Sequence, residues 1–351
     1  MLYNIKKTLE EKKIELFDAI NNKDPEHVHK ILEDLTQLKK EGHITKKDMD
    51  SIINNKNDDS KNLLIHAFDV DAPLDILELL IKYGADVNLQ CNEHSILAWS
   101  LIYSMSEDYI RYLLNKGANT RWISYDGLTC AMYAIQQTSY DSSIILQLLN
   151  DEIINKTDYY KKETVFLMAS RISSYDIVKN ILEHYKTKID INQRNEFGNS
   201  ALMLSIKGSN ADKLEITREL ITAGIDINLQ NNDGDTALML SIKGSDADKL
   251  EITRELITAG IDINLQNNNG DTALILSIKN QNKINENVIR QLINAGANKD
   301  LQNKGGFTVK HYIDRIYNSG IKHIIQNIVY PPIFIQNPGN EKIVLGTPVI
   351  Y

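Results

Sequence analysis

The chain has 351 residues, of which 42% are hydrophobic and 25% are charged, and its formal net charge is −8. This composition is sufficient for a buried core, while an acidic balance disfavours broad binding of nucleic-acid phosphates. No stretch approaches the roughly 18 apolar residues of a membrane-spanning helix, and the residues that follow Met1 do not form an apolar secretory segment. We therefore expect a cytoplasmic protein without membrane contacts.

Residues 15–20 and 24–32 predict a first helix pair near the N-terminus. Asp24 is a suitable N-cap, and Pro25 suits the first turn of the second helix. His27 and His29 lie two residues apart and therefore face different sides of that helix, which favours solvated histidines over a metal site. We interpret residues 1–56 as a helical capping unit that closes one end of a stacked core.

A tandem duplication dominates the second half of the chain. Residues 199–234 match residues 235–270 at 32 of 36 positions, and the four differences are polar exchanges: Asn199/Asp235, Ser200/Thr236, Asn210/Asp246 and Asp233/Asn269. A unit of this length that recurs in tandem predicts a stack of small supersecondary units.

The duplicated unit predicts two short helices and a projecting turn. Gly234 supplies the positive φ of a tight turn, and Thr236 is a good N-cap for a first helix over 237–243. A second helix is expected from about Lys249 to Ala259, with Gly260 as a left-handed C-cap and residues 262–265 leaving in extended form. Neither helix is long enough to be stable alone, so stacking must stabilise both.

The turn glycine marks eight repeats at spacings of 33 to 36 residues. The marker residues are Ser60, Glu93, Gly127, Lys162, Gly198, Gly234, Gly270 and Gly306. We therefore assign residues 57–330 to an array of about eight repeats. Three markers are not glycine, which leaves the type of their turns open.

The repeat resembles the ankyrin repeat. The resemblance is carried by residues 234–239 (Gly-Asp-Thr-Ala-Leu-Met), by residues 260–264, and by the exit sequence Gly-Ala-Asp-Val-Asn at 84–88. It implies an all-α solenoid of stacked helix-turn-helix units with projecting β-turns. The family's histidine is replaced in the late repeats and kept only at His311, so hydrogen bonding between repeats through that side chain should be missing elsewhere; the replacements are Met203, Met239 and Ile275.

Residues 331–351 differ from the array. Segments 333–336 and 342–345 predict two short strands around a turn. We expect this hairpin-like tail to cover the open face of the last repeat, and the alternative is an apolar docking tag for a partner.

The sequence shows little catalytic chemistry. Cys91 and Cys130 have neither partner cysteines nor neighbouring histidines at ligand spacing, and the eight histidines are scattered. Phosphate-loop, zinc-protease and nucleophile-elbow motifs are absent. We predict a non-enzyme with no catalytic residue, no cofactor and no metal; the alternative is an enzyme or a nucleic-acid binder hidden in the weaker repeats between Glu93 and Lys162.

The resemblance implies a protein-interaction scaffold, and we expect a monomer whose partner lies along the concave face formed by turn tips and first helices. The alternative is a substrate adaptor that recruits a ubiquitin ligase through the tail or the N-terminal unit. The chain contains 49 isoleucines and 36 asparagines, a bias that AT-rich coding would produce. In this it resembles the ankyrin families of giant DNA viruses or intracellular bacteria. That resemblance would place the partner among host-cell proteins, in the host cytoplasm.

Cations recur every 36 residues at the ends of the first helices: Arg171, Lys207, Lys243, Lys279 and Arg315. We call this set the helix-end ladder. Stacked helices about 8–10 Å apart bring such charges within roughly one Debye length, which favours a partner with an acidic surface. The alternative is that duplication copied a solvating lysine.

Aromatic residues at the turn tips form a second candidate surface. They are Phe197, Phe307, Tyr125 and Tyr160, with Tyr159 beside them, and all are expected to be exposed. Trp99 is assigned to the core. Asn232, Asp235, Asn268 and Asp271 are interpreted as turn formers.

Overall fold

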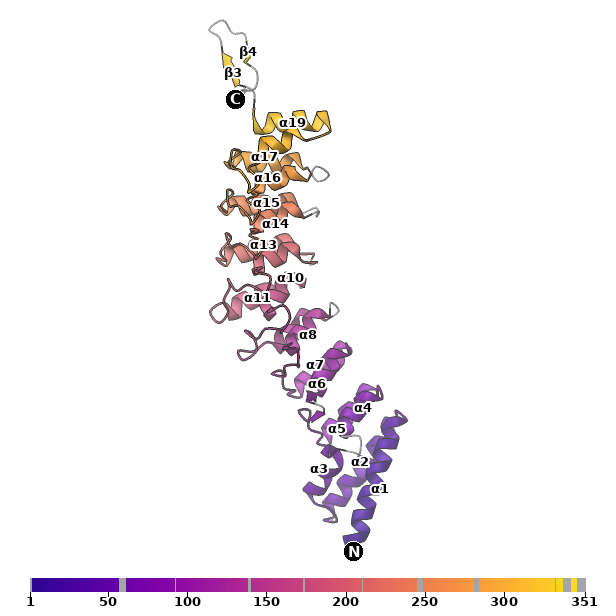
Figure 1. The fold of residues 1–351 in the computed structure, drawn as a ribbon. Coiled ribbons are helices and arrows are strands. Elements are labelled where there is room, and N and C mark those ends of the chain that lie inside the picture. Colours follow the sequence, from indigo (N-terminus) through magenta and orange to yellow (C-terminus); the bar gives the residue numbers. More distant parts are fainter. Residues whose placement is uncertain are drawn as a thin grey trace. The chain divides into compact units, whose positions relative to one another are not determined.

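The computed structural model describes residues 2–56, 61–91, 93–137, 140–172, 174–209, 211–244, 249–280, 284–331, 333–336 and 342–345. Two compact units divide the chain: unit 1 comprises Met1–Ile153 and unit 2 comprises Ile154–Tyr351. Stacked helix pairs build both units, and the described strands form two short hairpins (Figure 1). The predicted all-α repeat solenoid is confirmed.

Unit 1 begins with three helices: α1 (Leu2–Asn21), α2 (Pro25–Lys40) and α3 (Lys46–Asn54). Asp24 caps α2 as predicted, because its carboxylate accepts the His27 N–H at 3.0 Å. The sequence did not indicate α3, which starts in a reciprocal capping box between Thr45 and Asp48. Helix α1 packs on α4 and α2 packs on α5, so this segment occupies the places of a first and a second helix. Its role as a cap stays an interpretation.

Three repeats follow in unit 1. Each contains a first and a second helix: α4 (Leu63–Asp69) with α5 (Leu74–Lys82), α6 (Ile96–Ile102) with α7 (Glu107–Asn115), and α8 (Cys130–Gln136) with α9 (Ser142–Leu148). The first helices contact one another in sequence order, and the second helices α7 and α9 are also in contact. Around Glu93 the turn is a small antiparallel hairpin of β1 (Gln90–Cys91) and β2 (His94–Ser95).

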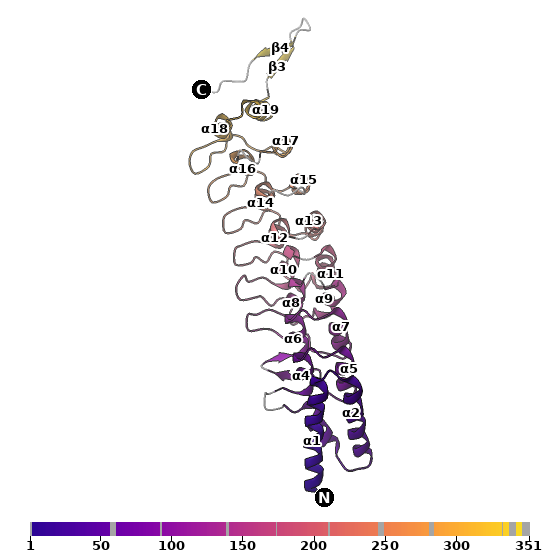
Figure 2. The same cartoon turned by 90° about the vertical axis from the view of Figure 1, so that its right-hand side faces the viewer.

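Unit 2 contains five repeats with the same order. Their helix pairs are α10 (Val165–Ile172) with α11 (Tyr175–Tyr185), α12 (Ala201–Lys207) with α13 (Lys213–Thr222), α14 (Ala237–Lys243) with α15 (Lys249–Thr258), α16 (Ala273–Lys279) with α17 (Glu286–Asn294), and α18 (Val309–Asp314) with α19 (Ser319–Val329). The first helices stack in one row and α11, α13, α15 and α17 in another (Figure 2). Within the unit, the turns project from the side of the first helices.

The duplicated repeat confirms the predicted helices. Thr236 accepts the Met239 N–H at 3.3 Å and begins α14, and Gly260 ends the second helix with a φ of 85°. Leu256 of the second helix is fully buried. The exit segment is not extended as expected: the Asp262 carboxylate accepts the Asn264 N–H at 2.9 Å and folds the chain into a turn.

The marker turns without glycine adopt the same left-handed backbone as the others. Glu93 has a φ of 67° and Lys162 a φ of 54°, close to the 76° of Gly234. A non-glycine residue pays a steric cost there, so hydrogen bonds of the surrounding turn must hold it. Ser60 lies outside the described residues.

The tail forms the predicted hairpin. Strands β3 (Ile333–Gln336) and β4 (Lys342–Leu345) are antiparallel, and Ile333 pairs with Leu345. Whether the hairpin covers the last repeat or docks a partner stays a prediction. Among the described helices, none is both long and apolar enough to cross a membrane.

Candidate functional site

The helix-end ladder is largely paired with buried carboxylates. In each repeat, one residue directly follows the marker residue. The ladder residue lies eight positions after it. At that earlier position Glu163 binds Arg171, with 2.9 Å between Oε2 and Nη2, and Asp271 binds Lys279, with 2.7 Å between Oδ2 and Nζ. Asp235 binds Lys243 in the same way. These three carboxylate side chains are at most 3% exposed, so each cation neutralises a charge beneath it.

These contacts correct the interpretation of Asp235 and Asp271, which are buried ion-pair partners as well as turn residues. The first repeat of unit 1 has the same pair with reversed signs, because Lys61 binds Asp69. A reversed pair at the same two repeat positions indicates that the pairing is structural. Opposite charges eight residues apart were the sequence signal for it. The hydrogen bond to Asp271 raises the pKa of Lys279 above its ordinary value.

Lys207 differs from the other ladder lysines. The residue eight positions before it is Asn199, one of the four differences between the duplicated repeats. Asn199 uses its side-chain oxygen to accept the Asn231 amide at 3.1 Å. Within the described part of the chain, Lys207 therefore extends from α12 without an ion pair.

The last repeat replaces the carboxylate with Phe307, and this corrects the prediction that Phe307 is exposed. Its ring is half-buried and stacked on His311 at a centroid distance of 4.1 Å, and the Arg315 guanidinium lies over it at 5.4 Å. The Nε2 atom of His311 is buried, and no described residue provides it with a hydrogen-bond partner. His311 thus stacks within its own repeat instead of linking repeats through this atom.

Asparagine side chains connect four turns of unit 2 to the turn of the preceding repeat. Asn267 accepts the N–H groups of Asn269 and Asp271 at 3.0 Å each, and donates to Asp235 of the preceding repeat at 2.9 Å. Equivalent asparagines are Asn195, Asn231 and Asn303. Because each amide serves two repeats, the buried carboxylates and asparagines form one polar ladder along unit 2.

Backbone hydrogen bonds also join neighbouring turn tips. The Asn232 N–H donates to the Phe197 carbonyl at 3.1 Å, and the Asn268 N–H donates to the Asp233 carbonyl at 2.9 Å. Asn232 and Asn268 also donate their side-chain amides to the preceding tip. The tips of unit 2 are therefore a rigid ridge and not separate loops.

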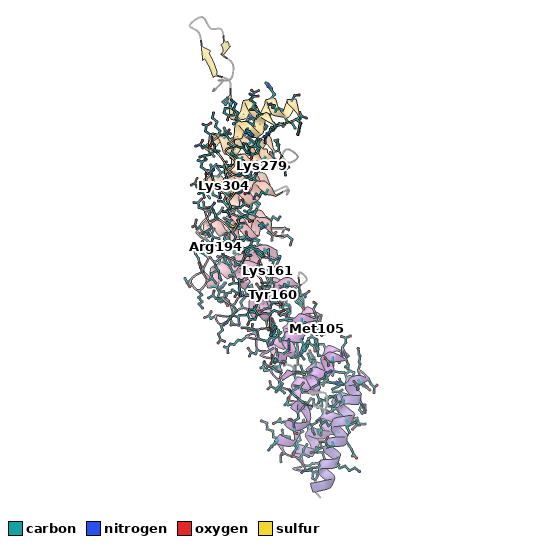
Figure 3. All side chains as sticks on the ribbon, viewed as in Figure 1. Met105, Tyr160, Lys161, Arg194, Lys279 and Lys304 are labelled. Atoms are coloured by element: carbon teal, nitrogen blue, oxygen red, sulfur yellow. The ribbon has the colours of Figure 1, made fainter. Side chains whose placement is uncertain are left out.

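Three of the predicted aromatics are exposed on this ridge. Tyr160 is 70% exposed, Tyr159 is 61% exposed and Phe197 is 56% exposed. The first two belong to one tip and Phe197 to the next, and the Glu196 N–H joins the tips by donating to the Lys161 carbonyl at 2.8 Å. We call the side chains of Tyr159, Tyr160, Lys161 and Phe197 the tip patch; Figure 3 labels Tyr160, Lys161 and the neighbouring exposed Arg194. Tyr125, in unit 1, is 92% exposed.

Trp99 is not a core residue. It is half-buried in a series of stacked rings on unit 1, with centroids 4.6 Å from His94 and 5.5 Å from Tyr103. Trp122 continues the series at 4.9 Å from His94, and its indole N–H donates to the Glu93 carbonyl at 2.8 Å. We call Tyr103, Trp99, His94, Trp122 and Tyr133 the aromatic row.

The buried thiol of Cys130 is unsuited to nucleophilic chemistry. Burial raises its pKa to about 12 from an ordinary value of 9.0, so the thiolate is not formed near neutral pH. No group of three His, Cys, Asp or Glu side chains in the described ranges is arranged to hold a metal ion.

We predict that native Cys130 resists iodoacetamide at pH 8 and reacts in denaturant, as intact mass would show. Above pH 9 the unfolded chain loses this thiol proton while the folded chain keeps it. Stability should therefore fall as pH rises from about 9 to about 12, and this fall should be smaller in Cys130→Ala. An alkylated native Cys130 would contradict the assignment.

The match to known families agrees with this architecture. The family model of ankyrin repeats (3 copies) matches residues 63–158, 165–251 and 208–303. These ranges cover more than half of the chain, so the protein belongs to the ankyrin-repeat family. Such repeats are generally protein-interaction modules and typically non-enzymatic scaffolds. No curated protein matches the chain.

Proposed function

We propose that the protein is a scaffold that binds a partner protein through the turn tips and first helices of unit 2. The tip patch supports this most directly, because three aromatic side chains stand exposed on two tips that hydrogen bonds hold in place. Exposed aromatic rings on a rigid surface provide contact area at low entropic cost. Aromatic side chains are also the most frequent hot spots of protein interfaces.

The charge preference of this surface centres on Lys207. The paired ladder cations stand above buried carboxylates, so their fields are largely cancelled at a distance. Neither Lys207 nor Lys161 is paired with a buried carboxylate of the polar ladder, so their positive charges are not cancelled in this way. We therefore propose that the partner presents an acidic group beside an apolar one.

The tip patch is tested by affinity capture from the native cell, with partners quantified by mass spectrometry. Tyr160→Ala combined with Phe197→Ala should reduce the captured partner by at least about tenfold. Tyr317→Ala removes a 95% exposed tyrosine that belongs to no turn tip and serves as the matched control. Equal capture by the tip variant and the control would contradict the proposal.

We propose further that the scaffold works in the cytoplasm, on a host-cell protein if the source is a virus or an intracellular bacterium. The abundance of isoleucine and asparagine, which AT-rich coding would produce, supports only the host-cell part of this proposal. A ubiquitin-ligase adaptor is the alternative. It would be favoured by capture of a cullin-type complex that disappears when residues 329–351 are deleted.

A further inference from the structure

Three rings of the aromatic row, His94, Trp99 and Tyr133, occupy repeat positions that the last repeat of unit 2 also fills with aromatic rings. His94 and Phe307 both directly follow a marker residue. Trp99 and Tyr312 both lie six positions after a marker. These rings can therefore be compared position by position, whereas Tyr103 lies ten positions after its marker, where the last repeat has Ile316.

In the last repeat, cations of the chain itself cover these rings. The Arg315 guanidinium lies 5.4 Å from the centroid of Phe307, and the Lys279 ammonium lies 5.8 Å from the centroid of Tyr312. Cation–π attraction of this kind strengthens when the ring and the cation share a partly desolvated surface. The repeat architecture thus already places cations over rings at these positions.

Tyr103, at one end of the aromatic row, has no such cover. It is 63% exposed, and among the described residues no lysine or arginine lies over its ring. One face of the ring stacks on Trp99, with 25° between the ring planes. The tilted ring of Phe68 also lies near Tyr103, at a centroid distance of 5.9 Å, and the solvent-exposed part of Tyr103 is the part that neither ring covers.

The charge around the row favours a cationic occupant. Residues 1–153 contain 16 Lys and Arg against 25 Asp and Glu, whereas residues 154–351 are nearly balanced, with 23 against 22. Next to the row, the exposed Glu93 directly precedes His94 and accepts the Trp122 indole N–H with its backbone carbonyl. A cation at Tyr103 would therefore meet a ring face on a unit whose net charge is negative.

We propose that the aromatic row docks an arginine-bearing segment of a partner protein, with a guanidinium stacked on Tyr103. Arginine suits this surface better than lysine, because its planar, weakly hydrated head stacks on flat rings. Unit 1 then selects a basic segment, in contrast to the acidic group proposed for the tip patch. The two proposals involve different residues and fail independently.

The test uses the two tryptophans of the chain, Trp99 and Trp122, which both belong to the row and report on it by fluorescence. The full chain is titrated with a synthetic peptide of alternating arginine and glycine, and with matched lysine and glutamate peptides. We expect a saturable change with the arginine peptide, weaker binding of the lysine peptide and no response to the glutamate peptide. Binding should weaken as salt rises.

Variants separate stacking from simple charge attraction. Tyr103→Ala should weaken binding of the arginine peptide by about two- to fivefold, and Glu93→Gln should flatten its salt dependence. Tyr317→Ala, in unit 2, should bind like the wild type. Urea unfolding of Tyr103→Ala checks that the exposed ring is not needed for folding. Equal binding of the arginine and lysine peptides, unchanged binding by Tyr103→Ala, or no saturable response would overturn the proposal.

Discussion

Lys243→Glu is expected to lower the free energy of unfolding by about 2 kcal/mol, whereas Lys207→Glu should change it by less than about 0.5 kcal/mol. The two lysines occupy the same position in nearly identical repeats. Lys243 neutralises the buried carboxylate of Asp235, and glutamate there would place two negative charges together. Lys207 has Asn199 at the partner position, so its reversal leaves no buried charge uncompensated.

Urea unfolding and hydrogen exchange of the α12 and α14 amides measure this difference. Asn199→Asp provides the control, because it copies the partner of Lys243 into the preceding repeat. In that background Lys207→Glu should become destabilising. Equal costs of the two reversals in the wild-type chain would show that the ion pairs do not stabilise the repeats.

The same contrast determines how the ladder can be tested for binding. Reversing Lys243 or Lys279 disturbs a buried pair and would confuse lost folding with lost binding. Lys207→Glu changes the surface charge without that effect. It is therefore the informative ladder variant for the acidic-partner proposal.

Gly234→Ala should be the more damaging of two glycine replacements, at about 3 kcal/mol against about 1 kcal/mol for Gly260→Ala. Both residues have positive φ, 76° and 85°, so both replacements strain the backbone. A Cβ at Gly234 would in addition lie 2.6 Å from the backbone nitrogen of Asn268, while nothing lies within 4 Å at Gly260. The clash would push apart the Asn268 N–H and the Asp233 carbonyl, which join the two tips.

Urea unfolding of the two variants tests the coupling between tips. Hydrogen exchange should show the loss of protection in Gly234→Ala extending to the Asn268 amide of the next repeat. In Gly260→Ala, the Asn268 amide should keep its protection. Equal losses of unfolding free energy in the two variants would contradict this. They would mean that the Gly234 turn can adopt a backbone conformation like that of Lys162, whose φ is 54°, and so accommodate a side chain.

The sequence predicted the helices of unit 2 well because their ends are determined locally. Thr236 and Gly260 mark the two ends of the duplicated helix pair through capping and backbone preferences that act within a few residues. The strand segments at 333–336 and 342–345 were equally local, and the structure pairs them as expected.

The surface was harder to predict, because its side-chain contacts join residues that only the folded repeat brings together. Asp235 and Lys243 meet only when the turn brings the residue before α14 next to the end of that helix. From the sequence, Phe307 is expected at an exposed turn tip. In the structure it is half-buried, because it stacks on His311 and the Arg315 guanidinium lies over its ring. The aromatic row joins residues from two repeats, and no single repeat of the sequence displays it.

We propose above that the ridge of unit 2 binds a protein. Hydrogen-exchange and hydroxyl-radical footprinting of the captured complex test it directly, with the free chain as reference. We predict protection at Tyr159, Tyr160 and Phe197, and at the end of α12 near Lys207, without added protection of α13 and α15. Protection confined to those second helices, or none in unit 2, would contradict the claim.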